Sequence, residues 1–368
     1  MVKGTTKKEA TIIYLEFLRT IAIILVIFIH TGNRGIYLYS TREYSVLYPF
    51  YYFCSVAPKA VAVPLFWMIS VSLLIPKKES ICALYKRRIL KMGLVLLIFS
   101  FSQYLYQLFQ VDISTFSVVD FLKTLYTSRF ATAYWYIYSY LGMLILLPLI
   151  RKMASQMSEK EYQYLFGLLL MIYGVIPAVE YLAGGGEVRL NSFFMENISS
   201  RWMVLFLLGH YVGNVVPEER LSARKAILLI FAGFMSIVAT CLIIRHVENV
   251  TGQSGWQNAD NMISSLYMLS MFIPSAALFY SARTFFIRYA DKIKAGTARC
   301  LTVTGGCSFG VMLTENIWRE RLSNVYESLR ALHCPSILAC AIWVTCVWVC
   351  GMSVTLILKK VPFIKKLL

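Results

Sequence analysis

The stretch YLEFLRTIAIILVIFIHTG, residues 14–32, carries the strongest signal in this chain. It is long and apolar enough to cross a membrane, since a transmembrane helix needs about 20 mostly apolar residues. It also contains Glu16, Arg19 and His30, which a simple membrane anchor does not need. Ionisable side chains are costly inside a bilayer unless they are paired or face a wet cavity, so they indicate function. We therefore expect a membrane helix that carries part of a functional site.

The spacing of these three residues places them on one side of the helix. His30 follows Arg19 by eleven residues, which is about 1100° of rotation, or three turns plus about 20°, and about 16 Å along the axis. Glu16 lies three residues before Arg19 and is within reach of it. The alternative is that Glu16 and Arg19 form a structural ion pair and that His30 is an interfacial residue at the helix end.

The composition extends the membrane interpretation to the whole chain. Of the 368 residues, 58% are hydrophobic and 15% are charged, and the mean hydropathy is +0.63. A soluble domain has about 45–50% apolar and about 25% charged residues. No polar block is long enough for a soluble domain, so we predict one integral membrane domain over residues 1–368. The net charge of +17 is explained by basic loops and not by binding to nucleic acid.

Long apolar segments recur along the chain, and the fold class they predict is all-α, a polytopic bundle. We expect about ten transmembrane helices. The predicted spans are residues 12–31, 56–75, 89–109, 132–150, 163–182, 200–216, 225–245, 262–282, 300–318 and 336–358. With these spans, about twice as many Lys and Arg residues fall on the side of the N-terminus as on the other side. The positive-inside rule then predicts that both termini are cytoplasmic.

The ordered set of motifs along these spans resembles that of a known family, the membrane-bound acyltransferase-3 family. The first-helix signature is LEFLRTIAIILVIFIH, with an acidic residue, an Arg three residues later and then a His. Further stretches that resemble the family in order are VPLFWMISVSLLI (63–75), YKRRILKMGLVLLIF (85–99), YWYIYSYLGMLILLPLI (134–150), FLLGHYVG (206–213) and SFGVMLTENIW (308–318).

This resemblance implies a membrane O-acyltransferase in the bacterial cytoplasmic membrane. The reaction would move an acyl group, usually acetyl, from cytosolic acetyl-CoA or another acyl-CoA to a hydroxyl of an exported or lipid-linked glycan. The acyl-CoA is then a substrate, and no bound cofactor is expected. The chain departs from the family pattern at Val71, where Gly is usual, at Tyr134, where His is frequent, and at Glu315, where many members have His.

The catalytic candidates are His30, Arg19 and Glu16. The unperturbed pKa of His, about 6.5, suits a general base that removes a proton from a hydroxyl. Both direct attack by the acceptor and an acyl-imidazole intermediate are compatible with this role. Arg19 is placed to orient the donor. Glu315 either orients His30 or holds the acceptor, and its alternative partner is Arg319, four residues on.

Two further groups are candidates for binding the substrates. Lys86, Arg87 and Arg88 form a basic loop suited to the phosphates of coenzyme A, although such a loop also follows from the positive-inside rule alone. Trp135 and Tyr134 are candidates for stacking on the acceptor sugar, or else belong to an interfacial aromatic belt. We expect no metal site, because no cluster of His, Cys and carboxylate residues is evident.

Two other functions are open at this point. A transporter of a small solute, such as an amino acid, would use the same ionisable groups to bind its substrate or to relay protons. A non-catalytic subunit of a glycan exporter is the third alternative. The expected partners are the lipid bilayer, acyl-CoA and a glycan, and the sequence leaves open whether the protein forms a homo-oligomer.

Overall fold

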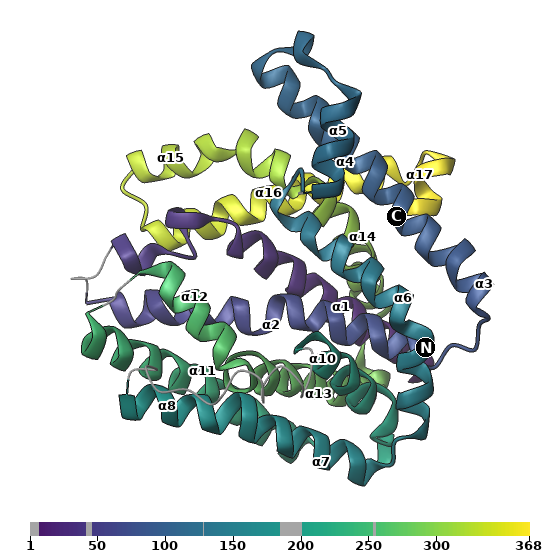
Figure 1. Ribbon diagram of the computed structural model, residues 1–368, viewed down its shortest axis with the longest axis vertical. Coiled ribbons are helices and arrows are strands. Elements are labelled where there is room, and N and C mark those ends of the chain that lie inside the picture. The colour runs from purple at the N-terminus through teal and green to yellow at the C-terminus, as the bar shows by residue number, and fades with distance from the viewer. Residues whose placement is uncertain (1–6, 42–45, 128, 185–200, 253–254) are drawn as a thin grey trace.

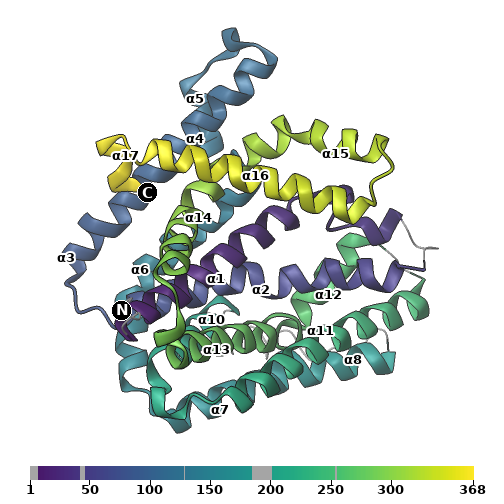
Figure 2. The same ribbon diagram turned by 180° about the vertical axis from the view of Figure 1, so that it is seen from behind.

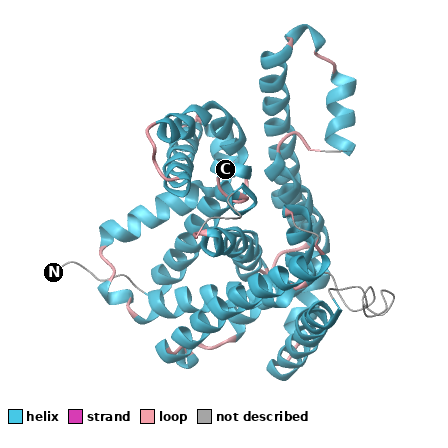
Figure 3. Cartoon of the chain, turned by 90° about the vertical axis from the view of Figure 1, so that its left-hand side faces the viewer, coloured by secondary structure: helices cyan, strands magenta, loops and turns pink. Residues whose placement is uncertain are grey.

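Helices are the only regular secondary structure in the part of the chain that the structure describes. The structure is a computed structural model, and it describes residues 7–41, 46–127, 129–184, 201–252 and 255–368. Every regular element in these ranges is an α-, 3-10 or π-helix, and none is a strand (Figure 3). The predicted all-α fold class is therefore confirmed.

The long elements form the body of the bundle. They are α1 (Lys7–Ile29), α2 (Tyr48–Leu74), α4 (Leu90–Val111), α6 (Trp135–Gln156), α7 (Glu159–Leu170), α11 (Ala223–Thr251), α13 (Ile273–Arg288), α14 (Ala295–Arg321) and α16 (Ser336–Leu358). Shorter helices connect them or extend them. These are α3 (Ile81–Leu84), α5 (Val118–Thr127), α8 (Ile176–Gly184), α10 (Arg201–His210), α12 (Trp256–Ser265), α15 (Ser323–Ala331) and α17 (Pro362–Leu367).

The structure supports most of the predicted spans. In the described ranges, seven helices are long and apolar enough to cross a membrane, and they are Glu9–Ile29, Tyr48–Leu74, Ile81–Val111, Thr132–Gln156, Glu159–Ala183, Ala223–Thr251 and Ser336–Leu358. An eighth span is formed if Trp256–Ser265 and Met268–Arg288, which meet at an angle of 87°, are counted together. The count of ten and the cytoplasmic termini stay predictions, because a helical bundle by itself does not define which end faces the cytoplasm.

Two predicted spans differ from simple membrane helices. The span at 200–216 is a short apolar helix, Met203–Val215. The span at 300–318 lies within α14, which is long but not among the helices apolar enough to cross a membrane alone. A helix enclosed by protein does not need an apolar surface on every side, because lipid contacts little of it.

Helix α14 is enclosed by α1 and α16. Gly305 lies against the backbone of Glu16 on α1, so a Cβ added there would lie 2.6 Å from Glu16 Cα. Gly310 lies against the side chain of Thr355 on α16. Small residues of this kind let membrane helices approach each other closely. The glycines of α14 thus bring its polar residues next to those of α1.

Helix α1 occupies the middle of the bundle (Figure 1). It packs against α14 and α2 over most of its length and also contacts α13 and α16. The group α7, α8, α11 and α13 lies on one side of α1 and α2, while α15 and α16 lie on the other, and α14 crosses α1 between these two groups (Figures 1 and 2). The helix with the most informative sequence is therefore the one that other helices surround.

Replacing Gly305 with Ala tests the close approach of α1 and α14. We expect Gly305→Ala to lower the free energy of unfolding by about 1–3 kcal/mol, because the added methyl group meets backbone atoms of Glu16. The matched control is Gly296→Ala on the same helix, where a Cβ meets nothing within 4 Å. Thermal unfolding in detergent measures both. Equal stability of the two variants would contradict the packing described here.

Candidate functional site

The three polar residues of α1 lie where the sequence predicts them. Glu16 and Arg19 lie near the middle of the helix, and Glu16 is buried. His30 comes directly after the last helical residue, and its amide still donates to Ile27 O at 3.1 Å. The ion-pair residues thus lie near the middle of α1, and the imidazole lies at its C-terminal end.

Glu16 and Arg19 form the predicted ion pair, in which Arg19 Nη1 donates to Glu16 Oε1. The hydroxyl of Thr20, one residue on, lies 3.0 Å from that of Thr304 on α14. Polar groups of α1 and α14 thus contact each other at this level of the bundle.

Arg19 also lines a cavity of about 350 Å³, called the Arg19 cavity below. Its walls come from α1, α2, α4, α6 and α14 and mix aromatic, small and charged side chains. The lining residues are Arg19, Phe66, Ser70, Lys91, Met92, Tyr136, Ile137, Tyr140, Gly305, Gly306, Ser308, Phe309, Met312 and Leu368.

Two lysines add positive charge to this cavity. Lys91 lines it directly. Lys359, just beyond α16, donates to the carbonyl oxygen of Gly306 at 2.6 Å, and Gly306 is itself a lining residue. Only one nitrogen of Arg19 donates to Glu16, so guanidinium N–H groups remain for a ligand. The cavity thus combines cationic groups with an apolar surface.

The residues of the predicted donor loop, Lys86, Arg87 and Arg88, are helical in the structure, in the π-helical turn Tyr85–Ile89, and they lie outside this lining. Lys86 and Arg87 are exposed. Arg88 Nε donates to Glu79 Oε1 at 2.8 Å, and Arg151 Nη2 donates to the same oxygen at 2.7 Å. Burial alone would raise the pKa of Glu79, but the hydrogen bonds from Arg151 and Arg88 outweigh it and hold that pKa below its usual value. The charge of Arg88 is therefore matched by a carboxylate within the protein.

At the other end of α1, His30 meets Glu315. The imidazole Nδ1 lies 2.9 Å from Glu315 Oε1, and Glu315 is completely buried. On the other side of the carboxylate, Arg319 Nε lies 3.4 Å from Glu315 Oε2, and Arg319 Nη1 donates to the carbonyl oxygen of His30 at 2.5 Å. The two partners considered for Glu315, His30 and Arg319, therefore both contact it.

This arrangement suits proton transfer. A carboxylate that accepts from Nδ1–H fixes the tautomer of the imidazole and leaves Nε2 as a base, and it stabilises the imidazolium that forms. His30 lines a second cavity, of about 460 Å³, called the His30 cavity below. Its lining residues are His30, Thr31, Gly32, Asn33, Arg34, Arg319, Glu320, Ser323 and Trp343.

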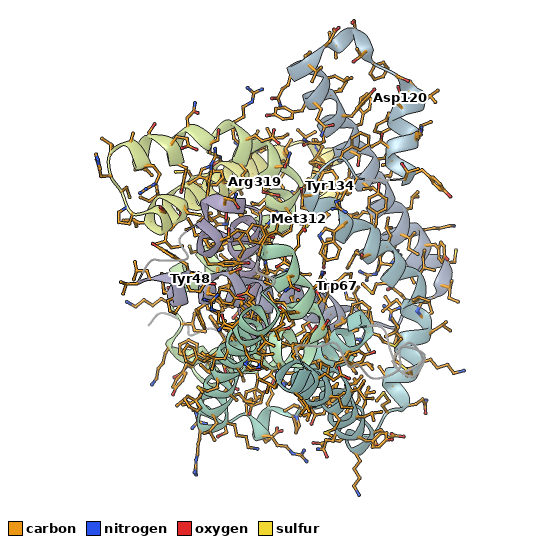
Figure 4. The ribbon with its side chains drawn as sticks, turned by 60° about the vertical axis from the view of Figure 1, so that its left-hand side comes forward. Tyr48, Trp67, Asp120, Tyr134, Met312 and Arg319 are labelled. Carbon is orange, nitrogen blue, oxygen red and sulfur yellow. The ribbon has the colours of Figure 1, made fainter. Side chains whose placement is uncertain are left out.

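The two aromatic candidates, Tyr134 and Trp135, line neither of these cavities. Tyr134 is buried, and its hydroxyl donates to the carbonyl oxygen of Leu313 on α14 at 2.9 Å. Figure 4 shows Tyr134, Met312 and Arg319 in the same part of the bundle. Trp135 is half-buried, with its ring centroid 6.2 Å from that of Tyr136. In this structure Tyr134 helps to hold α6 against α14, close to Glu315.

Two residues of the site, Lys91 and Lys359, were not predicted from the sequence. Lys91 is a lone cation in an apolar helix, so the rule that selected Arg19 applies to it as well. Lys359 lies in a basic stretch after an apolar helix, where the positive-inside rule explains it without a site. The helical period of the sequence does not distinguish Lys359 from the basic residues near it.

The fold and the site define a class of protein, a polytopic helical membrane protein with a buried acid–histidine pair. The chain belongs to the acyltransferase-3 family, because the family model described as an acyltransferase domain matches residues 12–354. The comparisons with curated proteins and with solved structures found no match. Family membership indicates an enzyme that transfers acyl groups in a membrane.

Replacing Glu315 tests how much its buried carboxylate contributes to the stability of the fold. We expect Glu315→Ala to lower the free energy of unfolding by about 3–5 kcal/mol, because it leaves the Arg319 guanidinium without its partner. Glu327→Ala breaks an exposed pair with Arg34 and should cost about 1 kcal/mol or less. Denaturant unfolding in detergent compares the two. A Glu315 variant as stable as the Glu327 variant would show that the buried contacts contribute little.

Proposed function

We propose that this protein is a membrane O-acyltransferase that moves an acyl group, most often acetyl, from a cytosolic acyl-CoA to a hydroxyl of an exported or lipid-linked glycan. The observation that carries the proposal is the contact between His30 and Glu315 at one end of α1, with the cationic Arg19 cavity toward the other end. A base and an anion-binding cavity are the two parts that this reaction needs.

The Arg19 cavity is the proposed donor site. Coenzyme A is polyanionic, and Arg19 and Lys91 present cationic groups next to aromatic and methionine side chains that suit the pantetheine arm. The exposed Lys86 and Arg87 would attract the phosphates at the protein surface. Arg88 would have to exchange Glu79 for a phosphate, so it is the least suitable of the three loop cations.

The His30 cavity is the proposed acceptor site. Besides His30, Thr31, Asn33 and Ser323 line it with groups that can hydrogen-bond to sugar hydroxyls. In the proposed step, His30 Nε2 removes the proton from the acceptor hydroxyl while its oxygen attacks the thioester carbonyl carbon. The C–S bond then breaks, and the departing thiolate takes the proton from the imidazolium. Glu315 stabilises this imidazolium throughout.

The setting of this reaction is proposed to be the bacterial cytoplasmic membrane, with the donor on the cytosolic side. Both substrates would then approach the same seam between α1 and α14 from opposite sides of the bilayer. The acyl group would cross the membrane within the protein, without a free carrier.

One observation favours a second candidate, a solute transporter. The pair Trp256–Ser265 and Met268–Arg288 is bent by 87°, and transporters form binding sites at broken helices. Asp260, on the first of these helices, forms an ion pair with Lys59 of α2 and accepts a hydrogen bond from Tyr37 at 3.0 Å. This partnered group is separate from His30 and Arg19, so the transporter does not account for the residues of α1.

Replacing His30 tests the catalytic assignment in proteoliposomes supplied with acetyl-CoA and a cell-envelope glycan fraction. We expect His30→Ala to slow the release of free CoA at least about 100-fold, because it removes the general base. His246→Ala, which changes an exposed His on α11, is the control and should keep the wild-type rate. Intact transfer in His30→Ala would refute the assignment. Solute accumulation without thioester cleavage in the wild type would favour the transporter.

Replacing Arg19 tests the placement of the donor. We expect Arg19→Ala to raise the KM for acyl-CoA about tenfold or more, because a charge-assisted hydrogen bond to the donor is lost. Arg129→Ala removes an exposed Arg that lines neither cavity and should leave this KM unchanged. Initial rates at varied acyl-CoA measure both variants. Equal effects would place the donor elsewhere.

A further inference from the structure

Ser308 is a buried polar residue that the proposed reaction does not yet use. It lies on α14, is 2% exposed and lines the Arg19 cavity. Its hydroxyl Oγ has no hydrogen-bond partner in the described part of the chain. Glycines 305 and 306 precede it on the same helix, so no bulky side chain of the preceding turn covers it on that side.

Other hydroxyls on these helices behave differently. Those of Thr302 and Thr314 on α14, and of Ser353 and Thr355 on α16, each donate to the carbonyl oxygen four residues earlier, at 2.7–3.1 Å. A hydroxyl within a membrane helix satisfies itself in this way when it has no other partner. Ser308 has the same local option and does not take it, which leaves its O–H available to a ligand in the cavity.

Ser308 begins a stripe that leads to the catalytic pair. Met312 follows it by four residues and Glu315 by seven, so the three side chains leave one side of α14 within about 60° of each other. Met312 is 6% exposed and lines the Arg19 cavity, whereas Glu315 does not. Met312 is thus the lining residue of this stripe that is nearest in sequence to Glu315, three residues before it, and Figure 4 shows it near Arg319, which also contacts Glu315.

We propose that Ser308 Oγ–H donates a hydrogen bond to the carbonyl oxygen of the donor thioester, and that the acyl group points at Met312, which limits its length. Side chains four residues apart on a helix are neighbours, with about 5–6 Å between Cβ atoms, so Met312 is within reach of an acyl group whose carbonyl oxygen contacts Ser308. The inference rests on the acyl-CoA donor of the proposed function and adds where its reacting carbonyl lies.

This placement has a chemical consequence. When the acceptor oxygen attacks, the carbonyl oxygen gains negative charge, and a fixed hydroxyl donor stabilises it more than it stabilises the ground state. The methionine side chain is unbranched and has three rotatable bonds, so it can move aside and let the acceptor hydroxyl and its base His30 reach the carbonyl carbon. Ser308, Met312 and Glu315 would then act in the order in which they occur along α14.

Two donor analogues separate this role from a structural one. Acetyl-CoA and S-ethyl-CoA differ by the carbonyl oxygen, and their affinities for the detergent-solubilised full chain can be measured without acceptor. We expect Ser308→Ala to weaken the binding of acetyl-CoA about fivefold, to leave that of S-ethyl-CoA unchanged, and to lower kcat at least about tenfold. Ser308→Thr, which keeps a hydroxyl, should restore the preference for acetyl-CoA.

Two other results would overturn the proposal. Equal weakening of both analogues by Ser308→Ala would overturn the assignment of Ser308 and leave the donor site in place. Failure of either analogue to bind the wild type would overturn the proposed donor together with this inference. Ser353→Ala, a back-bonded and exposed Ser on α16, is the control for folding and should keep both affinities.

The acyl-length limit has its own test. We expect Met312→Ala to raise kcat/KM for hexanoyl-CoA relative to acetyl-CoA about tenfold, because the shorter side chain lengthens the cavity in the direction of the acyl group. Met92→Ala removes the same side chain from another wall of the same cavity. Any effect of that change should be the same for both donors. An unchanged ratio in Met312→Ala, or an equal rise in Met92→Ala, would overturn the role of Met312.

Discussion

The burial of the Glu315 carboxylate is the constraint on which the rest of this structure depends. A charge held completely away from water is strongly unfavourable unless its neighbours compensate it. Here the compensation comes from His30 at the end of α1 and from Arg319 one turn further along α14. Arg319 also bonds the backbone of His30, so the same group that neutralises the carboxylate ties the two helices together. The contacts that neutralise the carboxylate and those that join the two helices are therefore one set.

The close packing of α1 and α14 makes that compensation possible. Gly305 lets the backbones approach at the level of Glu16, and the hydroxyls of Thr20 and Thr304 meet beside it. The polar groups of two helices then form one seam, with the Arg19 cavity along it and the His30 cavity at its end. A polar seam inside a bilayer needs surrounding protein. This need explains why α14 packs between other helices and why it is not among the helices apolar enough to cross a membrane alone.

Much of the fold and part of the site followed from local patterns. The apolar segments predicted the all-helical class, and the rotation between Arg19 and His30 placed them on one stripe. The sequence did not indicate contacts that depend on which segments meet. The basic loop at Lys86 to Arg88 looked like a phosphate site, yet Arg88 is occupied by Glu79, and Lys91 reaches the cavity instead. Tyr134 resembled a sugar-stacking residue, but its hydroxyl bonds the backbone of α14.

The sequence by itself determined that this chain is a helical membrane protein and that its first helix carries an acid, a guanidinium and an imidazole along one side. Those properties depend on composition and on the helical period, which act within a single segment. Only the tertiary structure decided that Glu315, 285 residues further along the chain, contacts His30, and that Ser308 and Lys91 share a cavity with Arg19. The physical reason is that helices meet where their surfaces fit each other. No single segment of the sequence contains that information.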